Sequence, residues 1–167
     1  MKTLKILFVL CIMLGFTIPA NSQGKQVERP MKGRFYEQTV DATNPAAVKS
    51  VFTANVTHMG NVTGIAIADM SKMKKEGNVI TNISNYKTKV AANGDVIYSV
   101  IDPNIGLGYI TLVVEDPVNM TGRMYGRAIT VGGTGRFEGC SGYVDVSGTF
   151  NLKTGIKEYT VDGWIKY

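Results

Sequence analysis

Residues 130–143 read TVGGTGRFEGCSGY, and this glycine-rich stretch decides how the rest of the chain is interpreted. Glycines at Gly132, Gly133 and Gly135 can supply a positive φ or a bulge where the chain turns between two strands. A phosphate-binding loop is the competing interpretation. No Gly-Lys-Ser/Thr follows the glycines, and the continuation has the pattern of a strand instead of a helix that could hold an anion. We therefore expect a structural turn between strands.

The same stretch resembles the VGGTGxFxxAxGY hairpin of the allene oxide cyclase and dirigent superfamily. Residues 144–149 resemble the strand that follows it in bacterial relatives, and residues 57–64 resemble a hairpin motif of exported bacterial members. The resemblance implies an eight-stranded antiparallel barrel with an apolar cavity, a fold whose plant members are often trimeric. It implies a structural hairpin formed by Gly132, Gly133, Gly135, Phe137, Gly142 and Tyr143, in which Phe137 plugs the barrel end or its core.

The resemblance supports an inference about the fold more strongly than an inference about the activity. Plant dirigent proteins usually have an arginine at the position of Ser141 and often a basic residue at that of Glu138. No catalytic acid of the family aligns with a position of this chain. We therefore transfer no catalytic residue, and the resemblance implies only a cavity for a small hydrophobic molecule.

Away from this stretch the chain alternates between apolar and polar residues, as strands do. The pattern predicts strands over residues 33–40, 48–57, 62–70, 78–91, 96–101, 107–115, 122–131, 143–152 and 156–167. The apolar members of the fourth strand are Ile80, Tyr86 and Val90, and the lysine-rich residues 71–77 before it are interpreted as a loop. Many short strands at regular spacing are typical of a β-sandwich or a β-barrel.

Two features favour the barrel. Gly64, Gly126, Gly148 and Gly163 lie inside predicted strands, where glycine allows tight bends and close packing as a sheet coils on itself. The chain also ends on a long strand, and closure of a barrel would pair that edge. The predicted fold is a closed antiparallel barrel, with a sandwich as the alternative.

The N-terminus has the features of a secretory signal peptide. Lys2 and Lys5 precede a short apolar run, and small residues follow it up to Ser22. We expect cleavage near Ser22 and a secreted or periplasmic protein whose mature part, residues 23–167, is one domain. No other stretch is apolar enough for a stable membrane span.

Composition excludes several classes of function. After cleavage the net charge is +3, and the basic residues are spread along the chain instead of forming the stripe of a nucleic-acid binder. His58 is the only histidine and Cys140 the only cysteine of the mature part, so a two-histidine zinc site is excluded and no cofactor is expected.

The remaining candidates for chemistry are few. Cys140 could be a nucleophile, although a buried apolar thiol is the favoured interpretation. His58 is expected to end a strand and bond its hairpin loop. Asp145 and Asp162 lie within strands, and either would become a candidate acid or base if it pointed into the barrel, where burial would raise its pKa.

Three functions stay open. The first is a binding barrel that holds a small hydrophobic molecule outside the cytoplasm. The second is a structural module that uses its outer sheet to form a homo-oligomer. The third is a cyclase or isomerase that acts on an apolar substrate, and an enzyme is the least favoured of the three. A measurable cavity would separate the first and third from the second.

Overall fold

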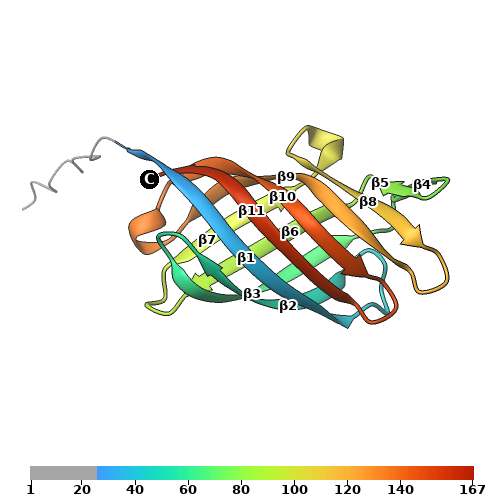
Figure 1. Ribbon diagram of the computed structural model, residues 1–167. Coiled ribbons are helices and arrows are strands. Elements are labelled where there is room, and N and C mark those ends of the chain that lie inside the picture. Colours follow the sequence, from blue (N-terminus) through green and yellow to red (C-terminus); the bar gives the residue numbers. More distant parts are fainter. Residues whose placement is uncertain (1–25) are drawn as a thin grey trace, which may run out of the picture.

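Strands form nearly all the regular structure of residues 26–167, the part of the chain that the computed structural model describes (Figure 1). The strands are β1 (Glu28–Asp41), β2 (Val48–Val56), β3 (Gly60–Asp69), β4 (Lys74–Glu76), β5 (Val79–Thr81), β6 (Ser84–Ala91), β7 (Val96–Ile101), β8 (Tyr109–Asp116), β9 (Thr121–Gly133), β10 (Ser141–Asn151) and β11 (Ile156–Lys166). Two single 3-10 turns, η1 (Pro103–Ile105) and η2 (Gly135–Phe137), interrupt them. The predicted signal peptide lies outside the described residues.

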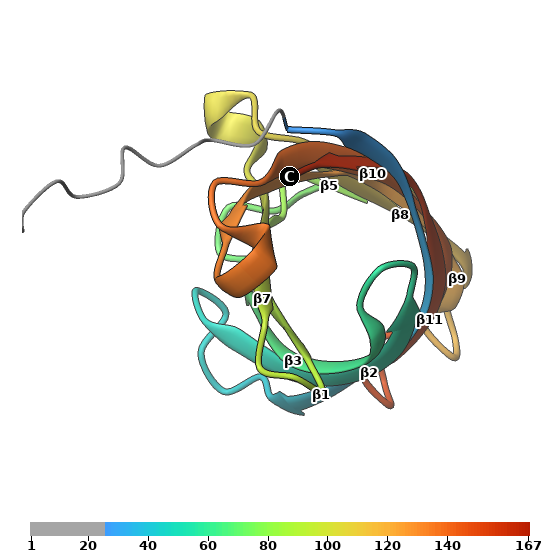
Figure 2. The ribbon, with the colours of Figure 1, turned by 90° about the vertical axis from the view of Figure 1, so that its left-hand side faces the viewer.

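The strands close into a ring, which Figure 2 shows end-on. Neighbours pair antiparallel in the order β10-β11-β1-β2-β3-β6-β7-β9, and β9 pairs back onto β10. Strands β7 and β8 both pair with β9 and act as two halves of one barrel strand, separated by an excursion that contains η1. The fold is therefore a closed eight-stranded antiparallel barrel, and the prediction of a barrel instead of a sandwich is confirmed.

Glycines on the inner face allow the sheet to coil this tightly. A Cβ atom on Gly64 would lie 2.0 Å from the carbonyl oxygen of Thr88 and 2.3 Å from the ring of Phe52. A Cβ atom on Gly148 would lie 2.2 Å from the carbonyl oxygen of Glu158. No side chain fits at such separations, so glycine at these positions lets neighbouring backbones approach where the barrel bends.

The glycine-rich stretch builds one end of the barrel, next to the C-terminus (Figure 2). Gly132 has a φ of 145° and lies where the pairing of β7 with β9 shifts by one residue, so it forms a bulge. Gly135, with a φ of 61°, begins η2. The side chain of Arg136 lies 3.0 Å from Asp95, which ties η2 to the turn between β6 and β7.

Phe137 follows on η2 and is fully buried, with its ring 4.9 Å from that of Tyr167. Gly133 has ordinary φ, but a Cβ there would lie 2.3 Å from the carbonyl oxygen of Val96. Gly142 has a φ of 152° at the start of β10, and the Tyr143 ring packs against Trp164 at 5.4 Å. The segment thus turns the chain between strands and places an aromatic side chain across this end of the barrel.

Three details of the predicted strands are wrong. The first strand begins at Glu28, because its pairing with β11 extends that far. Residues 71–77, predicted as a loop, contain β4, which forms a small hairpin with β5. Residues 78–91 are not one strand, because Asn82 has a φ of 58° and separates β5 from β6.

Candidate functional site

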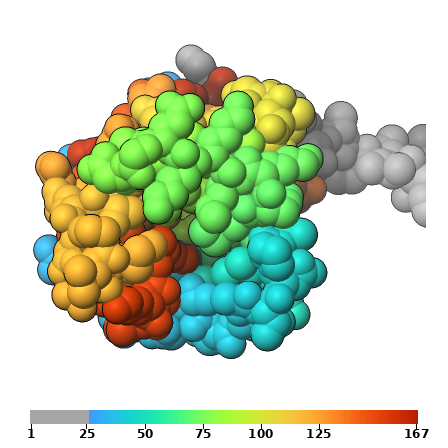
Figure 3. Space-filling model, turned by 90° about the vertical axis from the view of Figure 1, so that its right-hand side faces the viewer, coloured from blue at the N-terminus to red at the C-terminus, as the bar shows by residue number. Residues whose placement is uncertain are grey.

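The barrel encloses a cavity of about 250 Å³. Apolar side chains from β8, β9 and β10, among them Leu112, Met124 and Val146, form much of its wall. Its lining reaches Ala42 and Leu152, in the loops at the end of the barrel opposite η2. Figure 3 views this opposite end, where a hollow lies between the cyan, green, orange and red segments. At the η2 end the barrel is filled by buried side chains that do not line the cavity, among them Met31, Phe137 and Ile165. The cavity is therefore closed at that end and reaches the surface at the other.

A buried carboxylate lies in the cavity wall opposite the apolar side. Glu37 on β1 is only 1% exposed, and two lysines approach it. Lys157, its cross-strand partner on β11, places Nζ 2.6 Å from Oε1. Lys87 reaches across the lumen from β6 and places Nζ 2.5 Å from Oε2. The hydroxyl of Tyr159 donates a hydrogen bond of 3.0 Å to Oε2, so every oxygen of the carboxylate is paired.

The lysines decide the charge of this cluster. Burial alone would raise the pKa of Glu37, but the ammonium groups of Lys87 and Lys157 outweigh burial and lower that pKa to about 2. Burial lowers the pKa of Lys87, and the carboxylate of Glu37 opposes that shift. The pKa of Tyr159 is raised well above its usual value by burial and by the neighbouring carboxylate. The carboxylate of Glu37 is thus the shared counter-ion of Lys87 and Lys157, and it is ionised at neutral pH.

Lys89 is in a different situation, although it also lines the cavity from β6. It is 3% exposed and donates a hydrogen bond to Oγ of Ser99 on β7. No carboxylate among residues 26–167 forms an ion pair with it. Burial and the charge of Lys87, only partly opposed by Cys140, lower the pKa of Lys89 to about 7. This side chain is a buried amine without a compensating negative charge.

A further polar atom in the wall lacks a partner. The Oδ1 atom of Asn85, on the same strand as Lys87 and Lys89, is buried and accepts no hydrogen bond from the described residues. A buried acceptor in this state costs free energy unless a donor reaches it. The cavity wall therefore contains both an amine without a carboxylate partner and an acceptor without a donor.

The acids singled out from the sequence lie elsewhere. Asp145 and Asp162 are cross-strand partners on the outer face of β10 and β11. Arg127 binds Asp145 at 2.7 Å, and Lys32 lies 3.0 Å from Asp162, so both carboxylates have exposed ion pairs. The hydrogen bond from Arg127 lowers the pKa of Asp145 instead of raising it. Neither aspartate is a candidate acid or base in the cavity.

Cys140 and His58 have structural surroundings. Cys140 is a free thiol that is 2% exposed, and burial raises its pKa, as expected of an inert apolar thiol. His58 lies in the β2–β3 hairpin with a φ of 65°, and its Nε2 is 3.0 Å from the carbonyl oxygen of Pro30 on β1. The expectation that it bonds its own hairpin loop through the ring is wrong, because the ring bridges to the neighbouring strand.

The sequence analysis did not identify the buried ionisable residues, and on β6 the apolar residues do not mark the inner face. Tyr86 was interpreted as an apolar member of its strand, yet it is 43% exposed, while Lys87 and Lys89 point into the barrel. The small residues Gly64 and Ala66 are the cross-strand partners of Lys89 and Lys87 on the inner face of β3. Ile65 and Ile67, which alternate with Gly64 and Ala66 along β3, are more apolar but lie on the outer face. Apolar character therefore does not mark the inner face of this strand.

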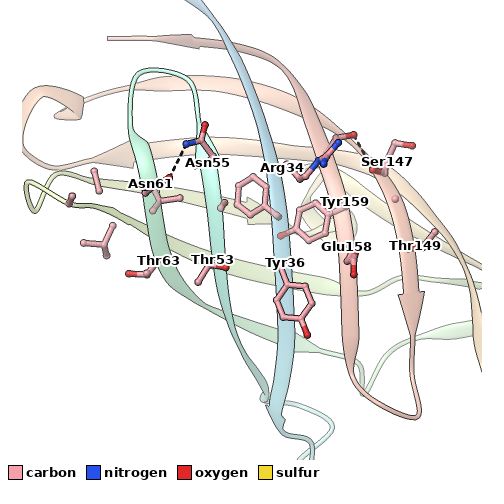
Figure 4. Close-up of a pocket in the computed structure, with 18 residues that line it drawn as sticks. Arg34, Tyr36, Thr53, Asn55, Asn61, Thr63, Ser147, Thr149, Glu158 and Tyr159 are labelled. Atoms are coloured by element: carbon pink, nitrogen blue, oxygen red, sulfur yellow. Dashed lines mark hydrogen bonds between the residues drawn. The ribbon is translucent and has the colours of Figure 1, made fainter.

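The outer wall carries a broader depression of about 1000 Å³, over β3, β2, β1, β11 and β10 (Figure 4). Exposed Arg34, Tyr36 and Thr53 line it, and Asn55 donates a hydrogen bond of 2.9 Å to Asn61 at its edge. None of the buried lysines described above contributes to it. The inner cavity is therefore the candidate site, although the outer depression is larger.

Residues 26–167 contain no group of three or more histidine, cysteine, aspartate or glutamate side chains placed to hold a metal ion. None of their helices has the length and apolar character needed to cross a membrane.

Comparisons with known proteins give no activity for this chain. No protein-family model and no curated protein matches the chain. The chain is similar to the solved structure of the pterocarpan synthase dirigent protein GePTS1, with a TM-score of 0.49 and 13% identity over 86% of each chain. The barrel assignment rests on the strand pairing of this chain.

Proposed function

We propose that this protein is exported and binds a small hydrophobic molecule inside the barrel. The cavity of about 250 Å³, closed at one end by the packed core around Phe137 and walled by apolar side chains, carries the proposal. Barrels of eight strands are just wide enough to be filled by side chains or to hold one small ligand. Small inward residues, Ala68 and Ala128, leave space that larger side chains would fill.

The polar wall indicates what the ligand carries. Lys87, Lys89 and Lys157 offer N–H donors to the lumen, while the buried carboxylate of Glu37 already has three partners. A ligand that is mostly apolar and has one hydrogen-bond acceptor, such as a carbonyl oxygen, matches this division. The apolar part would contact β8, β9 and β10, and the acceptor would face the lysines.

The test measures the fluorescence of N-phenylnaphthylamine, an apolar probe that brightens in apolar surroundings. The purified protein is expected to bind the probe, and native mass spectrometry is expected to find a single bound molecule. Ala68→Phe, which fills the cavity from β3, should abolish binding. Ile67→Phe, one residue away on the outer face of the same strand, is the matched control and should retain it.

Equal binding by both variants would place the probe on the outer surface and contradict the proposal. Failure of the wild type to take up any apolar molecule would also contradict it. Circular dichroism of each variant distinguishes a filled cavity from an unfolded barrel.

A second function has an observation in its favour. Val51 and Ile65 are cross-strand neighbours on the outer face, as are Ile67 and Tyr86, and all four are more than 40% exposed. A cluster of exposed apolar side chains on a sheet is suited to association with a second copy. Light scattering should show an oligomer that Ile65→Lys converts to a monomer, and a wild-type monomer would remove this function.

A further inference from the structure

The inner part of the cavity contains a lysine without a carboxylate partner. Lys89 lies nearer to the closed end than Lys87, because the turn that follows β6 is tied to η2 by the ion pair of Asp95 with Arg136. Its Nζ atom bonds Oγ of Ser99, and the residue lines the cavity. A ligand that fills the lumen would therefore meet a buried amine at its inner end.

We propose that Lys89 forms an imine with an apolar aldehyde or ketone that occupies the barrel cavity. The inference rests on the proposed binding function and names the chemical class of the ligand. It makes binding covalent and reversible, and it assigns the amine of Lys89 as the group that contacts the reacting carbon.

The surroundings favour the nucleophilic form of the amine. A lysine becomes a nucleophile when it loses its proton, and apolar burial or a neighbouring cation promotes that loss. Lys89 has both, because it is 3% exposed and Lys87 lies two residues away on the same face of β6. With a pKa of about 7, about half of the Lys89 side chains are neutral at that pH.

The other two cavity lysines differ in their partners. Lys87 and Lys157 both donate to the carboxylate of Glu37, and its negative charge favours their protonated forms. They therefore serve as hydrogen-bond donors, whereas Lys89 has a hydroxyl partner that leaves the lone pair of a neutral amine free. Selective reaction at Lys89 follows from this difference.

The step needs no reagent beyond amine and carbonyl. The lone pair of Nζ forms a bond to the carbonyl carbon, and the electron pair of the C=O π bond passes to oxygen. The two amine protons leave with that oxygen as water, and the C=N bond forms. No atom is oxidised or reduced, and hydrolysis returns both partners.

The experiment incubates the full protein with nonanal and traps any imine with cyanoborohydride. Peptide mapping by mass spectrometry then locates the nonyl group. We expect Lys89 to be modified at least about tenfold faster than exposed Lys153 in the same molecule, because only a neutral amine attacks the carbonyl. Lys89→Met should lose the cavity adduct and retain slow modification of the surface.

Displacement of N-phenylnaphthylamine by nonanal and by nonanol separates this inference from the proposed function. If both compounds displace the probe but Lys89 is modified no faster than Lys153, the imine is excluded and non-covalent binding stands. If neither displaces the probe and no adduct forms, cavity binding fails as well. Because the comparison is made within one wild-type molecule, it does not depend on the folding of a variant.

Discussion

Glu37 and Lys89 are both buried in the same barrel, but one has too many partners and the other too few. Glu37 receives two ammonium groups and a hydroxyl, whereas Lys89 has one neutral hydroxyl. Burial alone therefore does not set the charge of a side chain. The pKa of Glu37 falls despite burial because cations surround it, and that of Lys89 falls because burial and a cation act in the same direction.

The largest change is expected from Glu37→Gln. This variant removes the negative charge and leaves Lys87 and Lys157 buried without a counter-ion. Loss of one partner from a buried ion pair typically costs about 3–5 kcal/mol. We expect a decrease of that size in the free energy of unfolding from urea denaturation. A barrel as stable as the wild type would show that water, not Glu37, compensates the lysines.

Lys89→Met should have the opposite sign. An apolar side chain of similar length removes a buried amine that lacks an anion, and replacement of buried charges by apolar groups can stabilise a protein by about 1–4 kcal/mol. The same urea denaturation at neutral pH measures the gain. Lys157→Met is the matched control: it removes a lysine that has a carboxylate partner and should not stabilise. A loss of stability in Lys89→Met would mean that Lys89 is better compensated than its contacts indicate.

Stability should rise with pH because of Lys89. The pKa of Lys89 is about 7 in the folded barrel and takes the ordinary lysine value of 10.5 in the unfolded chain. Above pH 7 the unfolded chain therefore binds more protons than the folded one. The free energy of unfolding should therefore increase, by at most about 1.4 kcal/mol per pH unit. The window closes near pH 9.0, where Cys140 of the unfolded chain begins to ionise and acts in the opposite direction. The increase should be smaller in Lys89→Met; an equal slope would assign it to Lys87.

Tyr159→Phe tests the hydroxyl that Glu37 accepts from. The substitution keeps the ring, which stacks on Phe35 at 5.0 Å. It removes the hydrogen bond that the hydroxyl donates to Glu37 and the one that it accepts from Lys87. Hydrogen bonds to charged groups contribute about 1.5 kcal/mol or more, and Glu37 retains its two lysines. A loss near that value in urea denaturation is expected, clearly smaller than that of Glu37→Gln.

The smallest effect is expected from Asp145→Asn. Its ion pair with Arg127 is exposed on the outer face, and exposed pairs contribute little because water screens them. The urea midpoint should stay within experimental error of the wild type. A measurable loss would show that the outer face is more protected than its exposure suggests, as in an oligomer.

The sequence predicted the fold from features that any barrel must have. Glycines within strands, regular turn spacing and the glycine-rich stretch near Phe137 all relate to backbone geometry, which local sequence controls. The interior chemistry was not predictable in the same way. Lys87 and Glu37 are 50 positions apart and meet only because the sheet closes, with two strands between them.

On β6, the alternation of apolar and polar residues did not indicate which face of the strand is enclosed by the barrel. A strand has two faces, and a one-residue difference in interpretation exchanges them. Tyr86 counts as an apolar member of the strand, but its side chain is exposed and Lys87 and Lys89 line the cavity instead. Only the three-dimensional arrangement shows which face is enclosed.

Phe137 has a consequence for how the barrel exchanges its contents. Because that ring and other packed core side chains fill one end of the barrel, molecules that enter at the loops near Ala42 and Leu152 must return by the same route. The barrel is therefore a cavity with a single opening and not a channel. Entry and exit through that opening would set the rates of ligand association and dissociation. Substitutions in these loops should therefore change the residence time of a ligand more than its affinity.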